Sequence, residues 1–267
     1  MQDIENNIDD IEADRVEDKF EWLSLIIVVI FAFMIRIFVL ELFFVPTGSM
    51  KATILEGDYI FSTKYSYGYS KHSFPFSPNI FSGRIMADQP NRGDVVIMRP
   101  PHNMDIRYIK RLIGLPGDKI ELKNNLVYIN DVPIKRTEVG GYRDKSGKEY
   151  IKYKEILDNG VSYFAYKLKD ALDNELYIHY SNFGPYIVPN NHYFFLGDNR
   201  DESGDSRAQL GVVPFENLIS KGRFVIFSTE EFLFKDDIGF LEQMGRIWIW
   251  IKNIRFNRMF THLEEEV

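Results

Sequence analysis

Between residues 22 and 40 the chain runs for 19 residues with a single charged side chain, Arg36. At about 1.5 Å per helical residue this segment is ~28 Å long, close to the hydrocarbon thickness of a bilayer. Residues 23–35 are apolar on every helical face except at Ser24, whereas a helix on a soluble protein normally shows a polar stripe. Arg36 lies near one end, where its side chain can reach the headgroups. The sequence therefore predicts a transmembrane anchor over residues 22–44.

The charge of the chain is concentrated ahead of this anchor. Residues 1–21 hold nine acidic and two basic side chains, which accounts for the whole formal charge of −7 and leaves the remainder neutral. A cleaved signal peptide begins with basic residues and ends in small ones, whereas Phe43-Phe44-Val45 follows the apolar run here. We therefore expect an uncleaved anchor preceded by a solvated acidic tail. A neutral remainder also lacks the global field that gathers nucleic acid, so no nucleic-acid partner is expected.

After residue 45 the pattern changes to short apolar runs bounded by Gly, Pro, Asn and Asp, which is typical of a mostly β domain. Asn124-Asn125 between two such runs predicts a tight hairpin turn. Residues 130–190 lack this punctuation and are expected to form an inserted subdomain, while residues 64–92 are expected to form an irregular loop or flap. The expected strands are Tyr59–Thr63, Asp94–Met98, Arg107–Ile113, Lys119–Lys123, Leu126–Ile129, Tyr193–Leu196 and Lys221–Ser228.

The expected fold class is thus mostly β: one N-terminal transmembrane helix, then an antiparallel β domain with an inserted β-rich subdomain. The expected boundaries are a tail at 1–21, an anchor at 22–44, a main domain at 45–129 and 191–260, an insertion at 130–190 and a C-terminal tail at 261–267. Cysteine is absent, which excludes disulfides, thiolate nucleophiles and cysteine-ligated metals.

Ser49 is a candidate nucleophile just beyond the anchor. An alcohol needs a base within hydrogen-bonding reach and donors for the developing oxyanion. Gly48 lets the backbone turn closely and leaves room for a substrate carbonyl, and Thr47 adds a second hydroxyl. Gly-Ser is also a common loop dipeptide, so these residues alone do not distinguish a catalytic serine from an ordinary one.

Lysine is a better candidate base than histidine. The five histidines have no accompanying Gly-x-Ser-x-Gly elbow, which leaves a Ser-His-Asp triad with little support. Lys110 is flanked by Ile109, Leu112 and Ile113 on an expected strand, and burial there lowers the pKa of an amine. Arg111 beside it cannot lose its proton and so cannot be the base. The alternative is a surface lysine on an edge strand.

A polar loop from Gly197 to Arg207 follows the expected strand at 193–196. Its acids do not follow the spacing of an EF-hand, which makes a calcium loop a weak interpretation. As support for an active site, Ser203 could orient the lysine amine, while Asp205 and Arg207 could pair and hold the loop rigid.

Taken together, these segments resemble the bacterial type I signal peptidases, the Ser-Lys leader peptidases. The resemblance covers the anchor and most of residues 36–225, and it rests on four blocks in order behind the anchor. The blocks are Pro46-Thr47-Gly48-Ser49-Met50, Arg92-Gly93-Asp94-Val95-Val96, the segment from Tyr108 to Asp118, and the segment from Gly197 to Arg207.

The resemblance implies a membrane-bound serine endopeptidase that removes signal peptides without any metal or organic cofactor. Ser49 would be the nucleophile and Lys110 the general base, Thr47 and the Ser49 N–H would form the oxyanion hole, and Ser203 would bond the Lys110 amine. It also implies a bacterial inner-membrane protein with a cytoplasmic N-terminus and a catalytic domain on the other face. Many members carry Ser where this chain has Thr47, which keeps the hydroxyl but restricts its rotamers.

The implied partners are membrane lipid and exported preproteins with small residues before the cleavage site. A shallow apolar pocket would then accept an extended substrate. The residues expected to flank or shape that pocket are Val45, Pro46, Met50, Tyr108 and Ile109.

Two alternatives remain open at this stage. The chain could be a membrane scaffold or assembly factor whose β domain binds a partner and catalyses nothing. A self-cleaving Ser-Lys repressor would need an N-terminal DNA-binding domain, where this chain has its anchor. Near the C-terminus, residues 246–252 alternate Trp with Ile, which predicts either a strand or a surface that touches the membrane.

Overall fold

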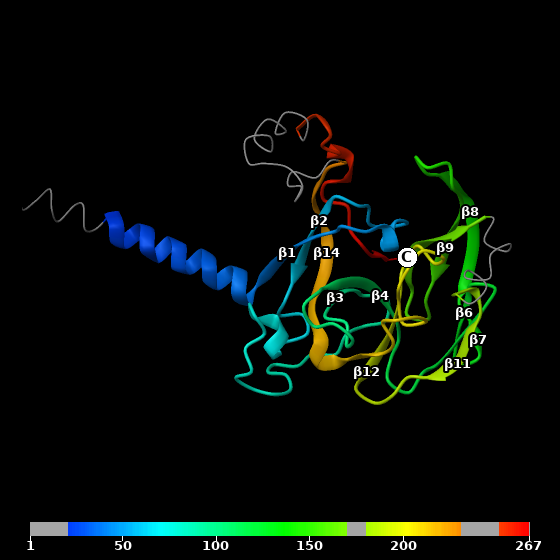
Figure 1. The fold of residues 1–267 in the computed structure, drawn as a ribbon, viewed down its shortest axis with the longest axis horizontal. Helices are drawn as coiled ribbons and strands as arrows, with labels where there is room; N and C mark the ends of the chain where they lie inside the picture. The colour runs from blue at the N-terminus through cyan, green and yellow to red at the C-terminus, as the bar shows by residue number, and fades with distance from the viewer. Residues whose placement is uncertain (1–20, 170–179, 231–250, 267) are drawn as a thin grey trace, which may run out of the picture.

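A computed structural model describes residues 21–169, 180–230 and 251–266 of the chain. The acidic tail and the Trp-Ile run at 246–250 lie outside these residues. The fold is mostly β, as expected, and the long N-terminal helix projects from it (Figure 1). The strands are β1 (Leu40–Phe44), β2 (Asp58–Thr63), β3 (Val95–Met98), β4 (Tyr108–Gly114), β5 (Lys119–Lys123), β6 (Leu126–Ile129), β7 (Val132–Pro133), β8 (Lys135–Arg143), β9 (Glu149–Ile156), β10 (Val161–Leu168), β11 (Phe183–Ile187), β12 (His192–Leu196), β13 (Val213–Pro214), β14 (Leu218–Ser228) and β15 (Glu265–Glu266).

The N-terminal helix covers Glu21–Phe38 and is long and apolar enough to cross a membrane. Its end corrects the expected anchor at 22–44, because Leu40–Phe44 forms strand β1 and pairs antiparallel with β2. The physical reason is a change of period: Glu41 and Phe43 point inward while Leu42 is exposed, so the side chains alternate as they do in a strand. The membrane helix therefore joins the β domain through one residue, Val39.

Seven antiparallel strands form the main sheet, in the order β1-β2-β14-β3-β4-β12-β13. The central strand β3 is buried on both faces: Val95 and Ile97 join one apolar cluster, whereas Val96 and Met98 join another. This sheet carries the candidate site, because β4 pairs with β3 and places Lys110 opposite Val96.

Two four-stranded sheets, β15-β10-β9-β8 and β11-β5-β6-β7, form the second part of the fold (Figure 1). The expected insertion at 130–190 therefore began too late, because β5 and β6, from residue 119 on, pair with β7 and β11 in one of these sheets. The turn at Asn124 and Asn125 is confirmed, since both residues have positive φ, of 49° and 62°. One apolar cluster runs from Ile113 through this part to Leu196, so the second part shares its core with the main sheet.

Residues 64–92 connect β2 to β3 without a strand of their own, and they contain the short helix η2 (Lys71–Ser73). The irregular segment expected here is confirmed. It packs against the end of the membrane helix: the Tyr69 hydroxyl donates to the Phe38 carbonyl at 2.6 Å, and the Phe38 and Phe74 rings lie 5.8 Å apart. The helix is thereby fixed to the domain at two points, through β1 and through this segment.

Candidate active site

Ser49 lies in a single turn of 3-10 helix, η1 (Gly48–Met50), directly after β1 and Pro46. The side chain is largely buried, at 8% exposure. As the second residue of a short helix, Ser49 has no carbonyl one turn earlier within the helix to accept its N–H, which leaves that donor pointing out of the turn. A Cβ on Gly48 would lie 2.8 Å from a Glu56 carboxylate oxygen, so a larger residue there would require the Glu56 side chain to move.

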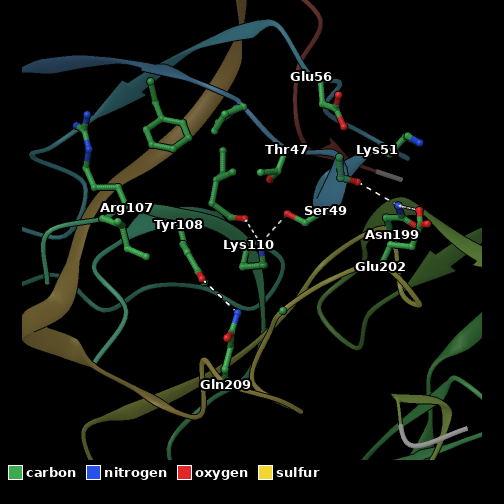
Figure 2. Close-up of a pocket in the computed structure, with 16 residues that line it drawn as sticks. Thr47, Ser49, Lys51, Glu56, Arg107, Tyr108, Lys110, Asn199, Glu202 and Gln209 are labelled. Atoms are coloured by element: carbon green, nitrogen blue, oxygen red, sulfur yellow. Dashed lines mark hydrogen bonds between the residues drawn. The ribbon is translucent and has the colours of Figure 1, made fainter. Parts of the chain in front are cut away.

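Lys110 reaches Ser49 from strand β4. Its Nζ lies 2.6 Å from Ser49 Oγ and also donates to the Ile109 carbonyl at 3.1 Å (Figure 2). The lysine side chain is 4% exposed. The two residues expected to form a nucleophile and a base, 61 positions apart in the chain, are therefore in hydrogen-bonding contact.

The environment of Lys110 favours its neutral form. Burial is the main cause and lowers the pKa of the amine to about 8, although the charges of Asp205 and Asp198 act in the opposite direction. An amine with this pKa is neutral in about a tenth of the molecules at pH 7, against less than about a thousandth for an ordinary lysine. Lys110 can therefore accept a proton near neutral pH.

The pair opens into a cleft of about 570 Å³. Pro46, Tyr108 and Ile109, three of the residues predicted to flank a substrate, line this cleft, and so does Thr47, the predicted oxyanion-hole residue. Thr47 is exposed there, two residues before Ser49, so its hydroxyl and the Ser49 N–H come from the same short turn.

Val45 and Met50 correct the expected pocket. Both are fully buried in the core of the main sheet and neither lines the cleft. Val45 alternates with Phe44 at the end of an extended strand, and Met50 closes a 3-10 turn whose inner side faces the sheet. Met50 also accepts a hydrogen bond from the Asp198 amide through its sulfur at 3.4 Å. Both residues therefore attach the turn that carries Ser49 to the core of the main sheet.

Asp205 and Arg207 pair in the polar loop, as expected. Arg207 Nε and Nη2 donate to the two carboxylate oxygens at 2.9 and 2.7 Å, and the Gly197 amide donates to the same carboxylate at 3.0 Å. The arginine holds the pKa of the buried Asp205 below its ordinary value in spite of the opposing effect of burial. The pairing thus closes the loop on itself behind the dyad.

Ser203 differs from its expected contact. Its hydroxyl is buried but makes no hydrogen bond to the described residues, so the expected bond to the Lys110 amine is not formed. It nevertheless lies close to the dyad, because a Cβ built on Gly197 would be 2.2 Å from Ser203 Oγ and 2.5 Å from the Ser49 carbonyl oxygen. A buried hydroxyl without a partner is costly, which makes this serine an available donor beside the site.

Asn199 is a site residue that the sequence did not single out. Its side-chain amide donates to the Gly48 carbonyl at 3.1 Å, and its backbone amide donates to the Ser49 carbonyl at 3.1 Å (Figure 2). Asn199 thereby holds Gly48 and Ser49 in place from the polar loop. The signal in the sequence was its position inside the polar loop, but nothing there indicated which loop residue would reach the turn.

The three aspartates of the loop face different partners. Asp198 pairs with Arg111 and Asp205 with Arg207, while Asp201 accepts from the Asn125 amide at 2.7 Å. In residues 21–169, 180–230 and 251–266 no three acidic or histidine side chains converge as metal ligands would. Within the described residues the loop is therefore cross-linked by arginine and amide groups.

Comparison with known proteins gives consistent matches over most of the chain. A family profile described as signal peptidase, peptidase S26, matches residues 19–227. The signal peptidase I of Rickettsia massiliae is 54% identical over 248 residues, which is 92% of this chain and 93% of that protein. That of Rickettsia bellii is 54% identical over 245 residues, or 91% and 85%. A crystal structure of a signal peptidase I from Enterococcus faecalis has 25% identity and a TM-score of 0.30, and it covers 50% of this chain and 97% of the other.

Proposed function

Because the chain belongs to the signal peptidase family, peptidase S26, we propose that Ser49 is its nucleophile and Lys110 its general base. As a member of this family it is a membrane-anchored serine endopeptidase that removes signal peptides. The observation that carries the assignment of roles is the 2.6 Å contact between Lys110 Nζ and Ser49 Oγ in a buried site. A scaffold without catalysis would have no need for an amine whose pKa burial lowers to about 8 beside a hydroxyl.

The reaction begins when the neutral Lys110 amine accepts the Ser49 hydroxyl proton while Ser49 Oγ bonds to the scissile carbonyl carbon. The developing oxyanion accepts hydrogen bonds from the Ser49 N–H and the Thr47 hydroxyl. Lys110 then gives its proton to the leaving amine, which breaks the C–N bond and leaves an acyl group on Ser49. Water, deprotonated by Lys110, hydrolyses this ester and restores the serine. The cycle uses side chains and backbone groups of the site alone.

The cleft supports a substrate with small residues before the cleavage site. Tyr108 and Ile109 line one wall of the cleft, on the strand that carries Lys110, and Pro46 lines another wall, on the segment that leads to Ser49. An extended peptide between the two walls would place its carbonyl at the turn of Ser49. Small side chains at the residues that meet these walls would let the scissile carbonyl approach the hydroxyl closely.

We further propose that the catalytic domain lies on the extracytoplasmic face of a bacterial inner membrane, with the N-terminus in the cytoplasm. The support is the family membership together with the short link of one residue between the helix and β1, which keeps the cleft near the surface where exported chains emerge. Exported preproteins are then the substrates. The anchor raises the local concentration of the enzyme where such substrates are found.

The test of the dyad uses purified full-length protein and a preprotein with an Ala-x-Ala cleavage site. Ser49→Ala and Lys110→Met are each expected to lower the cleavage rate by about 10⁴-fold or more while the thermal unfolding midpoint stays high enough for a folded enzyme. Lys119→Met is the matched control, because that lysine is partly exposed and pairs with Asp131 at 2.7 Å, away from the cleft. Normal processing by either dyad variant would refute the assignment.

The orientation has a separate test that uses the absence of cysteine. Single cysteines at Asn7 and at Lys145, whose side chain is 86% exposed, provide one label site on each side of the helix. A maleimide that does not cross membranes is expected to label Lys145→Cys in spheroplasts and to label Asn7→Cys only after lysis. The reverse pattern would place the catalytic domain in the cytoplasm.

A further inference from the structure

A second cavity, of about 330 Å³, lies between the end of the membrane helix and the β domain. Phe33, Arg36 and Ile37 form the helix wall of this cavity, which we call the junction cavity. The wall from the β domain includes Glu41 on β1 and Lys64 just after β2. The cavity therefore exists only because the helix and the β domain meet at this point, at the depth where the span ends.

Four cationic side chains line the junction cavity and outnumber the two carboxylates there. The cations are Arg36, Lys64, Arg99 and Arg107, and the carboxylates are Glu41 and Asp105. Since guanidinium and ammonium groups are fully charged unless burial neutralises them, the lining carries an excess of positive charge. The chemistry that this lining favours is an anion with several oxygen acceptors.

The carboxylates leave part of this charge unpaired. Glu41 is shared between Lys64, at 3.7 Å, and Arg107, which both contact its oxygens. Neither Arg36 nor Arg99 has a carboxylate within 4.0 Å among the residues that the structure describes. Within the described part of the chain, two guanidinium groups at this junction are thus without an ion-pair partner.

Arg99 has a hydrogen-bond donor that the described residues do not satisfy. Its Nε is buried and has no hydrogen-bond partner among the described residues, while its Nη1 donates to the Met104 carbonyl. Burial is the main cause that lowers the pKa of Arg99, and the charge of Arg107 adds to it, while the charges of Glu41 and Asp105 oppose it. The pKa of Lys64 is lowered as well, mainly by burial; the charge of Glu41 opposes this, and the charge of Arg36 lowers the pKa by a smaller amount. The cations of the cavity repel one another, and a bound anion would relieve that repulsion.

The position of the cavity points to the source of the anion. The helix wall is apolar at Phe33 and Ile37 and basic at Arg36, so it changes from hydrocarbon-facing to headgroup-facing within one turn. The segment that closes the cavity is fixed to the helix end through Tyr69 and Phe74. Exposed apolar side chains on the same segment, Phe76 and Ile80, give it a surface that can face lipid.

We propose that the junction cavity binds the phosphate group of a membrane phospholipid, with Arg36 and Arg99 as its principal donors and the acyl chains along Phe33 and Ile37. This inference goes beyond the protease assignment and rests on it in one respect, that the helix Glu21–Phe38 lies in a membrane. The excess of cations favours an anionic phospholipid over a zwitterionic one. A soluble phosphate ester offers the same oxygens without the acyl chains, and the test separates the two sources.

The test measures binding to the full-length protein in micelles of a non-ionic detergent by isothermal titration calorimetry. The probes are dioctanoyl phosphatidylglycerol, dioctanoyl phosphatidylcholine and sn-glycerol 3-phosphate. We expect saturable binding of one phosphatidylglycerol per chain, weaker binding of phosphatidylcholine, and binding of glycerol 3-phosphate weaker by about tenfold or more because it lacks the apolar contacts. Equal affinity for glycerol 3-phosphate would make this a site for soluble phosphate and would overturn the lipid proposal.

Two variants tie the binding to the cavity. Arg99→Gln and Arg36→Gln are each expected to weaken phosphatidylglycerol binding by about tenfold, the effect of losing charge-assisted hydrogen bonds. Arg36 is exposed on the helix, so its variant tests the site even where Arg99→Gln fails to fold.

Lys71→Gln is the control, because this substitution removes the same charge from the segment that closes the cavity. Lys71 itself pairs with Glu216 at 3.7 Å and does not line the cavity. An equal loss in Lys71→Gln, or no loss in either arginine variant, would show attraction to the surface in general and would overturn the proposal. Cleavage of a soluble peptide by the unaltered protein in lipid-free micelles tests the protease independently, so the two proposals can fail separately.

Discussion

The two faces of strand β4 give two neighbouring basic side chains, Lys110 and Arg111, different kinds of partner. Lys110 and Arg111 are adjacent, so their side chains leave the strand on opposite sides, and both are almost completely buried, at 4% and 0% exposure. On the cleft side Lys110 contacts a hydroxyl and a carbonyl. On the interior side Arg111 donates to both oxygens of Asp198, at 2.9 and 2.8 Å, and lies over the Tyr163 ring.

The difference shows that burial alone does not fix the charge of a side chain. Burial lowers the pKa of both groups, but for Arg111 the carboxylate of Asp198 more than compensates and the pKa ends above its ordinary value. For Lys110 the carboxylates of Asp205 and Asp198 act from a distance and burial prevails. On the interior face, Arg111 therefore forms a permanent ion pair with Asp198 that holds the loop to the strand. On the cleft face, Lys110 can lose its proton.

Replacing Lys110 by arginine should give the largest effect. In Lys110→Arg the cleft keeps a positive charge, but a guanidinium does not deprotonate and so cannot accept the Ser49 proton. We expect the preprotein cleavage rate to fall by about 10⁴-fold or more, as for loss of the base. Retention of substantial activity in a steady-state assay would mean that the charge of Lys110, rather than its basicity, serves the reaction.

Removing the carboxylate from the interior face should be the next largest effect. Asp198→Leu leaves Arg111 buried without its partner, which we expect to lower the free energy of unfolding by about 3–5 kcal/mol in a denaturant titration. The double variant Arg111→Met with Asp198→Leu removes both charges and is expected to recover much of that loss. A single variant as stable as the parent would show that water or Thr53, whose hydroxyl oxygen also accepts from Arg111 Nη2 at 3.3 Å, suffices for the buried charge.

The pH dependence of cleavage tests the cleft face. With the pKa of Lys110 lowered to about 8 by burial, the protonated amine predominates below pH 8 and cannot act as a base. We expect kcat/KM to rise about tenfold per pH unit from pH 6 towards pH 8 and to level off above it. Asp205→Asn should move this midpoint to lower pH, since the charge of Asp205 raises the pKa of Lys110. A flat profile with chemistry limiting would contradict a lysine base.

The smallest effect is expected at Ser203, whose buried hydroxyl lies close to Ser49 and has no partner among the described residues. We propose that it bonds the Lys110 amine once substrate excludes water, since catalytic hydrogen bonds often tighten only in the complex. Ser203→Ala should then lower kcat by about tenfold and displace the pH midpoint, without loss of thermal stability because the hydroxyl makes no hydrogen bond to the residues that the structure describes. Unchanged kcat and an unchanged midpoint would make Ser203 a packing residue.

Much of the fold could be predicted from the sequence where the signal is local. The membrane helix follows from the length of an apolar run, and Asn124-Asn125 marks a turn because asparagine tolerates positive φ. The strand at Leu40–Phe44 was missed because Leu and Phe suit a membrane helix as well as a strand, and only pairing with β2 decides between them. The early start of the second part was missed for the same reason, since β5 shows its partner β11 only in three dimensions.

The sequence by itself determined the anchor, the mostly β class and the residue types of the dyad, because length, period and residue chemistry are properties of short segments. Only the tertiary structure decided that Lys110 meets Ser49 at 2.6 Å, that Val45 and Met50 turn into the core, and that Asn199 holds the nucleophile turn. It also created the junction cavity, whose walls come from segments as far apart in the chain as Phe33 and Ile219. Distances between side chains depend on strand register and burial, and these are fixed only when distant segments pack together.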